Sequence, residues 1–176
     1  MDELTGLSTI HPKSNFFEQA KNKNENFGMI LLDIDGFNHC TYHYGYQEAD
    51  KQLRQIASLI RKVVPEEVDI FRSDGDEFTV FLYQKDMATV VSIAMQLKDT
   101  INQNFSLLEP IQRSWFFPDK STLSWQSHLS ISCGIVFYPQ HGKNFADLRQ
   151  TAFKAMYQIG KGHNQNGVLA IGELAE

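Results

Sequence analysis

Acidic residues gather at two points of this sequence, and their types and spacing suit the binding of a divalent cation. Asp33 and Asp35 stand at the end of an apolar run, and residues 74–77 (Asp-Gly-Asp-Glu) lie between two further apolar runs. Carboxylates that converge from a strand end and a hairpin tip form a hard-oxygen site of the kind that Mg²⁺ prefers. Because Mg²⁺ takes one or two carboxylates together with phosphate oxygens, the natural third party is a nucleoside triphosphate.

A purely structural role is the alternative interpretation of the same residues. Asp74-Gly75 is a favoured turn pair, and Asp35 follows a strand in a position that commonly caps a bend. Spacing alone favours this structural interpretation, and both remain open on the residues themselves.

The apolar pattern predicts the elements that must hold these acids. Residues 27–35 (FGMILLDID) are nearly continuously apolar, which is typical of a central strand buried on both faces. Strands over 68–72 and 78–83 flank a tight turn at Ser73–Asp76 and form a predicted hairpin. A polar bend is expected between the first strand and the next helix.

The remaining elements follow from helical and strand periodicity. Apolar residues recur at helical spacing in three segments, 46–64, 87–104 and 145–159. Residues 129–138 alternate, which predicts a strand with two different faces, and 167–171 is a short last strand. Strands interrupted by helices, with one hairpin in the middle, indicate an α+β or α/β sandwich.

Composition excludes several functional classes. The chain has 176 residues, of which 42% are hydrophobic and 21% charged, so one globular domain is expected. No run approaches the ~20 apolar residues of a membrane span, and the net charge of −5 argues against a nucleic-acid surface. Cys40 and Cys133 lie in apolar or strand-like runs and are expected to be reduced core thiols, with a disulfide as the less favoured alternative. We therefore expect a cytoplasmic domain without membrane contact, even if it belongs to a membrane-anchored protein.

Four motifs resemble those of one protein family. Residues 72–78 (RSDGDEF) resemble the GGDEF signature with its first glycine replaced by Asp. Residues 2–7 (DELTGL) resemble the family's DxLTGL opening, and 33–37 (DIDGF) resemble its DIDxF strand end. Gly45 and Asp50 lie at the family's spacing. Because the motifs occur in the family's order over nearly the whole chain, the sequence is identified as a member of the GGDEF family of bacterial cyclic di-GMP signalling.

The resemblance implies a nucleotidyl-cyclase-like palm with a central, largely antiparallel sheet flanked by helices. Active members join two GTP molecules into cyclic di-GMP across a homodimer. By resemblance, Asp33, Asp76 and the carbonyl of Ile34 would bind Mg²⁺ or Mn²⁺. Asp76 and Glu77 would be the catalytic acids, and Asp50 would contact guanine. The other nucleotide-binding positions by resemblance are Phe37, Asn38, Thr41, Asp74, Gly75 and Lys161.

Departures from the family's pattern predict weakened nucleotide binding. Asp74 places bulk and negative charge where glycine lets the backbone approach the nucleotide. Thr41 stands where an Asn usually reads guanine, and Asn38 where a Lys usually binds phosphate. Near the C-terminus the phosphate-binding Lys and Arg positions become Gly160 and Asn164, with one lysine a residue away as a candidate substitute. Each lost charge-assisted contact is worth about 1.5–3 kcal/mol.

Three functional hypotheses follow. In the first, residues 1–176 are a single GGDEF domain excised from a longer signalling protein; it binds GTP and Mg²⁺ weakly or not at all and regulates a neighbouring module such as an EAL phosphodiesterase. In the second, the retained acids suffice for an active diguanylate cyclase. In the third, the chain is a nucleotide-free interaction domain whose contact surface is the aromatic segment 105–127.

Overall fold

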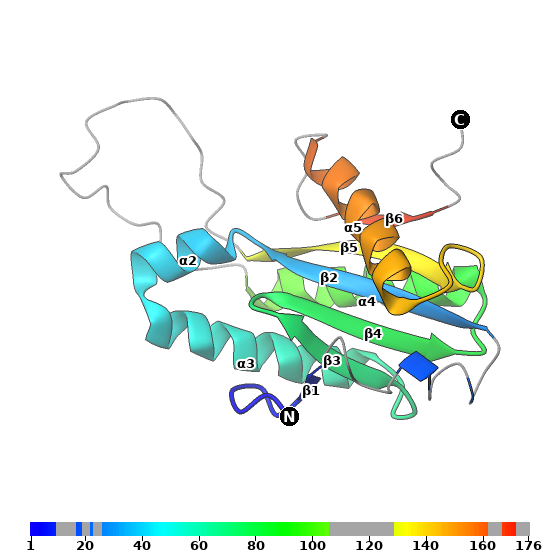
Figure 1. Ribbon diagram of the computed structural model, residues 1–176. Helices are drawn as coiled ribbons and strands as arrows, with labels where there is room; N and C mark the ends of the chain where they lie inside the picture. Colours follow the sequence, from blue (N-terminus) through cyan, green and yellow to red (C-terminus); the bar gives the residue numbers. More distant parts are fainter. Residues whose placement is uncertain (10–16, 19–21, 23–25, 106–128, 162–166, 172–176) are drawn as a thin grey trace.

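The computed structural model describes residues 1–9, 17–18, 22, 26–105, 129–161 and 167–171 (Figure 1). These residues form one six-stranded sheet with the strand order β1-β3-β4-β2-β5-β6. The strands are β1 Ser8–Thr9, β2 Phe27–Asp35, β3 Asp69–Asp74, β4 Glu77–Tyr83, β5 Ser130–Tyr138 and β6 Val168–Ala170. The four central strands pair antiparallel, whereas the edge strands β1 and β6 pair parallel with β3 and β5. The predicted α+β class and largely antiparallel sheet are confirmed.

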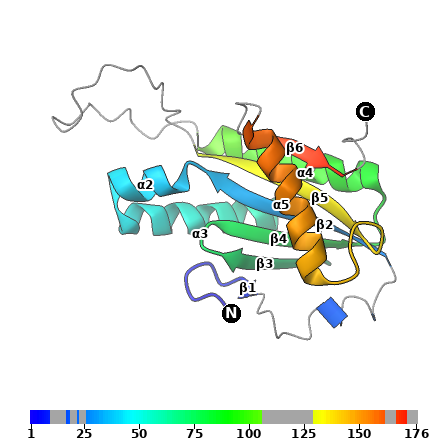
Figure 2. The same ribbon diagram turned by 45° about the horizontal axis from the view of Figure 1, so that its top comes forward.

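Helices cover both faces of the sheet (Figure 2). They are α2 Phe37–Tyr44, α3 Tyr46–Val63, α4 Met87–Asn104 and α5 Phe145–Lys161. Helices α3 and α4 pack on one face around a large aliphatic core, and α5 crosses the other face over a smaller core rich in Phe. The sheet therefore has two dissimilar faces, and only one of them carries the candidate site.

Local sequence signals explain where the helices begin and end. At the start of α4, the Asp86 carboxylate accepts a 2.8 Å hydrogen bond from the Thr89 amide, which caps the helix. Helix α3 has Arg61 and Lys62 in its last turn, where cations interact favourably with the helix dipole. Pro65 cannot continue that helix.

Two features of the backbone differ from the sequence prediction. The predicted polar bend is the helix α2, because Gly36, with φ 78°, turns the chain sharply from β2 into a helix. Strand β1 was not predicted, because two residues are too few to show a period.

Strand β5 has two different faces, as predicted, and both are buried. All residues from Ser130 to Val136 are buried. Ile131, Cys133 and Ile135 belong to the aliphatic core, whereas Val136 belongs to the core under α5. The aromatic segment proposed as an interaction surface lies outside the described residues, except for Phe105, which is buried.

Two expectations from composition can be compared with the structure. Cys40 and Cys133 are both free and buried, as predicted for core thiols. Among the described residues, no helix combines the length and the apolar character that crossing a membrane requires.

Candidate nucleotide and metal site

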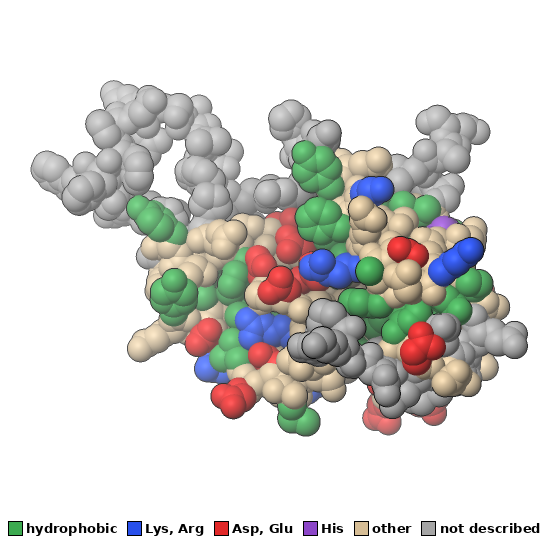
Figure 3. All heavy atoms as spheres, in the orientation of Figure 1, with side chains coloured by type: hydrophobic (Ala, Val, Ile, Leu, Met, Phe, Trp, Pro, Cys, Tyr) green, Lys and Arg blue, Asp and Glu red, His purple; other side chains and the backbone are tan. Residues whose placement is uncertain are grey.

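The site lies where the α5-facing side of the sheet changes from apolar to polar. Along β2, Phe27, Met29 and Leu31 belong to the core beneath α5. Because side chains alternate along a strand, Asp33 and Asp35 continue this same face. In Figure 3 acidic side chains gather at this end of the sheet, with a basic side chain beside them.

Three neighbouring strands contribute polar residues to this end. In the antiparallel register Asp33 lies opposite Glu77 of β4 and opposite Ser132 of β5. Asp35 lies opposite Ser130. The two acidic segments, residues 33–35 and 74–77, therefore lie at the same end of the sheet. Their places at a strand end and at a hairpin tip predicted this.

Asp35 joins β2 to β5. Its carboxylate accepts hydrogen bonds from Ser130 Oγ at 2.7 Å and Ser132 Oγ at 2.8 Å, and all three residues are buried. Asp35 thus has a structural role between two strands, which is more than the cap on a bend that the structural interpretation assigned to it. Sequence reasoning missed the two serines, although the Ser-Ile-Ser spacing mirrors Asp-Ile-Asp on the paired strand.

Asp33 sits in a concentration of negative charge. Burial and, after it, the neighbouring charges of Asp76, Asp35 and Glu77 together raise the pKa of its carboxyl to about 7. A divalent cation beside Asp33 would offset this repulsion.

The signature hairpin turns at Gly75 and Asp76, one residue later than predicted. Asp74 is the last residue of β3, and the register shifts between Arg72 and Asp74. The positive φ of the turn falls on Gly75 (29°), and Gln84 is the single described non-glycine residue with positive φ. Asp in place of the family's first glycine therefore causes no backbone strain at position 74.

Asp74 instead acts through its charge. It is exposed at the hairpin tip, and after burial it is a cause of the raised pKa values of both Asp76 and Glu77. The amide of Ile34 donates a 3.3 Å hydrogen bond to the Asp76 carbonyl, which joins the turn to the end of β2.

Arg149 of α5 binds the second signature acid. Its Nε and Nη2 donate to the two Glu77 carboxylate oxygens at 3.0 and 2.8 Å, a bidentate ion pair. The Glu77 side chain is 8% exposed and that of Arg149 41%. Burial raises the pKa of Glu77, while Arg149 lowers it. No local sequence signal predicts this pair, since 72 positions separate its members.

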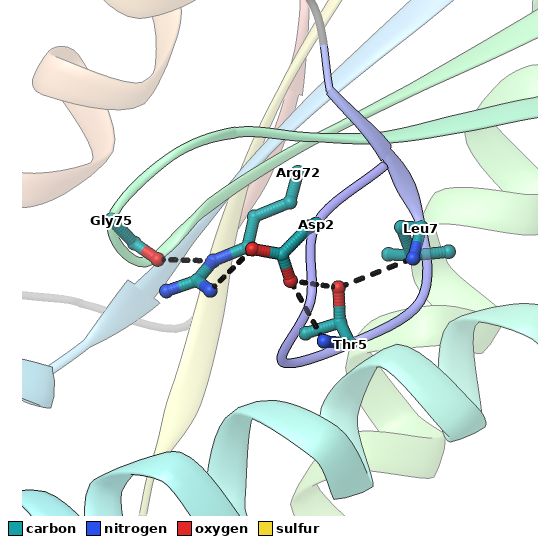
Figure 4. A network of polar contacts seen from close by, with 5 residues as sticks. All are labelled: Asp2, Thr5, Leu7, Arg72 and Gly75. Atoms are coloured by element: carbon teal, nitrogen blue, oxygen red, sulfur yellow. Dashed lines mark hydrogen bonds and ion pairs between the residues drawn. The ribbon is translucent and has the colours of Figure 1, made fainter.

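The N-terminal motif contacts the signature hairpin through Arg72 (Figure 4). Arg72 Nε donates to the Gly75 carbonyl at 2.8 Å, and its Nη1 donates to Asp2 Oδ1 at 3.0 Å. The other Asp2 oxygen accepts from the Thr5 amide at 2.7 Å. The DELTGL segment and the hairpin are therefore one connected polar unit.

The predicted nucleotide-binding residues of the helices lie on α2, α3 and α5. Asn38 is exposed, whereas the Thr41 hydroxyl donates to the Phe37 carbonyl at 3.1 Å, so its hydrogen is used within α2. Asp50 is half-buried in α3. Lys161 is the last residue of α5, and its side chain lies outside the described structure.

The first turn of α2 directly follows the acidic strand end. Its N-cap, Gly36, has no side chain to cap the helix. The amides of this turn are therefore available to an anion. Together with the acids of β2 and β4, they give this end of the sheet the elements of a metal–phosphate site.

The donor set fits a hard divalent cation. Asp33 and Asp76 offer carboxylates and Ile34 offers a carbonyl, all oxygen ligands of the type that Mg²⁺ and Mn²⁺ accept. Within the described parts of the chain no three His, Cys, Asp or Glu side chains are grouped as a ready-made metal cage. Phosphate oxygens would have to complete the coordination of a metal bound here.

A family model described as "Diguanylate cyclase, GGDEF domain" matches residues 1–166. The chain belongs to the GGDEF family. The identification from its four motifs is therefore confirmed.

Solved GGDEF domains share the fold. The GGDEF domain of YfiN from Pseudomonas aeruginosa is 26% identical; the match covers 96% of this chain and 92% of that chain, with a TM-score of 0.72. The GGDEF domain of DgcB from Caulobacter crescentus, solved in complex with c-di-GMP, is 21% identical; the match covers 97% of this chain and 94% of that chain, with a TM-score of 0.77.

Curated relatives of this GGDEF domain are longer than the chain. An uncharacterised membrane protein of Staphylococcus epidermidis is 26% identical over 175 residues, which is 96% of this chain and 45% of that protein. One of Staphylococcus saprophyticus is 27% identical over 139 residues, which is 77% of this chain and 35% of that protein. The chain thus spans less than half the length of these relatives.

Proposed function

We propose that this GGDEF domain binds GTP with Mg²⁺ weakly and acts as a regulatory part of a longer signalling protein, with little cyclase activity of its own. The observation that carries this proposal is the surplus of negative charge at the site. Asp33, Asp76 and Glu77 lie at adjoining strand ends, where the charges of Asp76 and Glu77 help to raise the pKa of Asp33 to about 7. Asp74 adds its charge at the hairpin tip.

The site offers little positive charge to a triphosphate. Arg72 and Arg149 are the described cations whose contacts reach this end, and each has its charge offset by an acid, Asp2 for Arg72 and Glu77 for Arg149. Affinity for GTP would therefore depend on the metal, which neutralises the phosphates and lowers the pKa of an attacking 3′-hydroxyl when bound. Asp33, Asp76 and the Ile34 carbonyl would hold that metal.

The other proposed roles follow from where the residues lie. The exposed Gly75 at the turn lets the backbone approach the phosphates, and the first amides of α2 face the same anion. The Thr41 hydroxyl already donates its hydrogen to a carbonyl within α2. Asp50 is therefore the main candidate for contacting guanine.

The regulated partner would be the remainder of a longer protein. Relatives more than twice as long as the chain support a flanking module. A phosphodiesterase of the EAL type is one form of this module, and a membrane-embedded part is the form that the names of the staphylococcal relatives suggest.

An active diguanylate cyclase is the second candidate function. It is favoured by the retention of Asp33, Asp76 and Glu77 at adjoining strand ends. The nucleotide-free interaction domain remains a prediction, because its aromatic segment lies outside the described residues.

Calorimetric titration of GTP with Mg²⁺, followed by chromatography of the incubated nucleotide, tests the proposal. We expect saturable GTP binding that Asp76→Ala abolishes, with no more cyclic di-GMP than this variant makes. Product clearly above the Asp76→Ala background would establish the cyclase instead. Absence of GTP binding by the wild-type chain would overturn both nucleotide hypotheses.

A further inference from the structure

Arg149 is a cation at the site that the family's motifs do not assign. It lies in the first half of α5 and reaches across to β4, where it binds Glu77 with both oxygens engaged. Glu77 is directly opposite Asp33 in the sheet, so Arg149 is bound to the neighbour of a proposed metal carboxylate. Figure 3 shows acidic and basic side chains close together on this face of the molecule.

The ion pair leaves much of the guanidinium open. A guanidinium has five N–H groups, and Glu77 takes one from Nε and one from Nη2. The Arg149 side chain is 41% exposed, whereas the Glu77 side chain beneath it is 8% exposed. Glu77 therefore holds Arg149 through one edge of the guanidinium, and the remaining N–H groups point away from the Glu77 carboxylate.

Arg72 does not offer the same opportunity. Its guanidinium binds the Gly75 carbonyl and Asp2, and its side chain is 17% exposed. Of the two described arginines that contact this end of the sheet, Arg149 is thus the more accessible to a ligand.

We propose that Arg149 is a phosphate-contacting residue of this site, engaging a nucleoside triphosphate through the N–H groups that Glu77 leaves open. This inference rests on the proposed binding of GTP and adds a residue to that site. A planar guanidinium held in place by a carboxylate is well suited to phosphate, because its fork matches two phosphate oxygens. Arg149 would then compensate in part for the basic residues that positions 38, 160 and 164 lack.

Binding measurements on the full chain with GTP–Mg²⁺ and with inorganic tripolyphosphate test this role. We expect Arg149→Gln to weaken binding of both ligands at least ~10-fold, the size of one charge-assisted contact, and Arg149→Lys to weaken it less. Arg54→Gln, a charge-matched change at an exposed position of α3, should leave both affinities unchanged. Thermal unfolding identifies the variants that remain folded.

A second variant distinguishes phosphate contact by Arg149 from a purely structural role of its ion pair with Glu77. Glu77→Gln keeps a side-chain oxygen that can accept from Arg149 but removes the negative charge that offsets the guanidinium, so it should strengthen tripolyphosphate binding in the wild-type background. In the Arg149→Gln background it should have a clearly smaller effect. Equal effects of Glu77→Gln in both backgrounds would overturn the proposed contact.

The outcomes also distinguish this inference from the proposed function. If the wild-type chain binds GTP and Arg149→Gln binds it equally well, the contact is wrong and the function stands. If the wild-type chain binds neither GTP nor tripolyphosphate, both proposals fall together.

Discussion

Asp33 shows that an arrangement suited to metal binding can lower the stability of the folded chain. Its carboxyl is largely buried beside Asp35, Asp76 and Glu77, and its pKa is raised from 3.8 to about 7. A buried acid held among other acids destabilises the folded state whenever it is ionised. The same concentration of carboxylates is what a divalent cation requires.

The raised pKa of Asp33 predicts a pH dependence of stability. Between pH 3.8 and about 7 the folded state retains a proton that the unfolded state releases, so the free energy of unfolding should fall as pH rises through this window. Asp33→Asn should flatten this dependence and raise stability at pH 8. Urea unfolding at pH 5 and pH 8, without divalent metal, measures both effects. An unchanged pH slope in Asp33→Asn would show that another group dominates.

Asp74 should weaken nucleotide binding through its charge, because its backbone is unstrained. We expect Asp74→Asn to improve the Kd for GTP–Mg²⁺ by roughly 3- to 10-fold, as expected for the removal of one exposed charge near an anionic ligand. Asp74→Gly should do the same. Improvement by Asp74→Gly alone would assign the effect to bulk, and no change in either variant would remove Asp74 as a cause.

At the level of elements, the close contact between α5 and β5 positions Arg149. A Cβ atom added to Gly134 of β5 would lie 2.1 Å from the carbonyl oxygen of Ala152 in α5. Glycine at this position lets the helix lie directly on the strand. Ala152 is one turn beyond Arg149, so the same contact sets the height of Arg149 above Glu77.

Gly134→Ala should push α5 away from the sheet. We expect overpacking to lower the free energy of unfolding by about 2–3 kcal/mol. We also expect it to disrupt the bidentate ion pair between Arg149 and Glu77. Ile135→Val is a control at the adjacent residue, which faces the opposite core; it should lower stability by about 1 kcal/mol and leave ligand affinity unchanged. Urea unfolding and GTP titration of both variants provide the comparison. A loss no larger than that of Ile135→Val would mean that α5 adjusts freely.

At the level of the whole molecule, the two faces of the sheet have different roles. The face under α3 and α4 is an uninterrupted aliphatic core, whereas the face under α5 is apolar at one end and acidic at the other. Stability is thus supplied mainly by one layer, and the site occupies the end of the other. One chain contributes one such site.

A cyclase built from this chain would need two copies to meet, because its product contains two GTP units. Any cyclic di-GMP formed should therefore increase more steeply than in proportion to protein concentration. Chromatography of product at several chain concentrations, at fixed GTP and Mg²⁺, measures this order. A rate strictly proportional to protein, together with a monomeric chain in solution at those concentrations, would contradict the expected homodimer.

The sequence by itself determined the elements with strong local patterns and the family. The strand 27–35 and the helix 87–104 have the bounds that their apolar periodicity predicts. The family follows from four short motifs that need no tertiary information, and the match over residues 1–166 confirms it. The residue roles taken from the resemblance remain predictions.

Only the tertiary structure decided how the acids are held. Asp35 binds serines 95 and 97 positions away, and Arg149 binds Glu77 across 72 positions. Such contacts depend on strand register and on where α5 crosses the sheet, and neither leaves a local period in the sequence. For the same reason the alternating pattern of β5 predicted two different faces but did not show that both are buried.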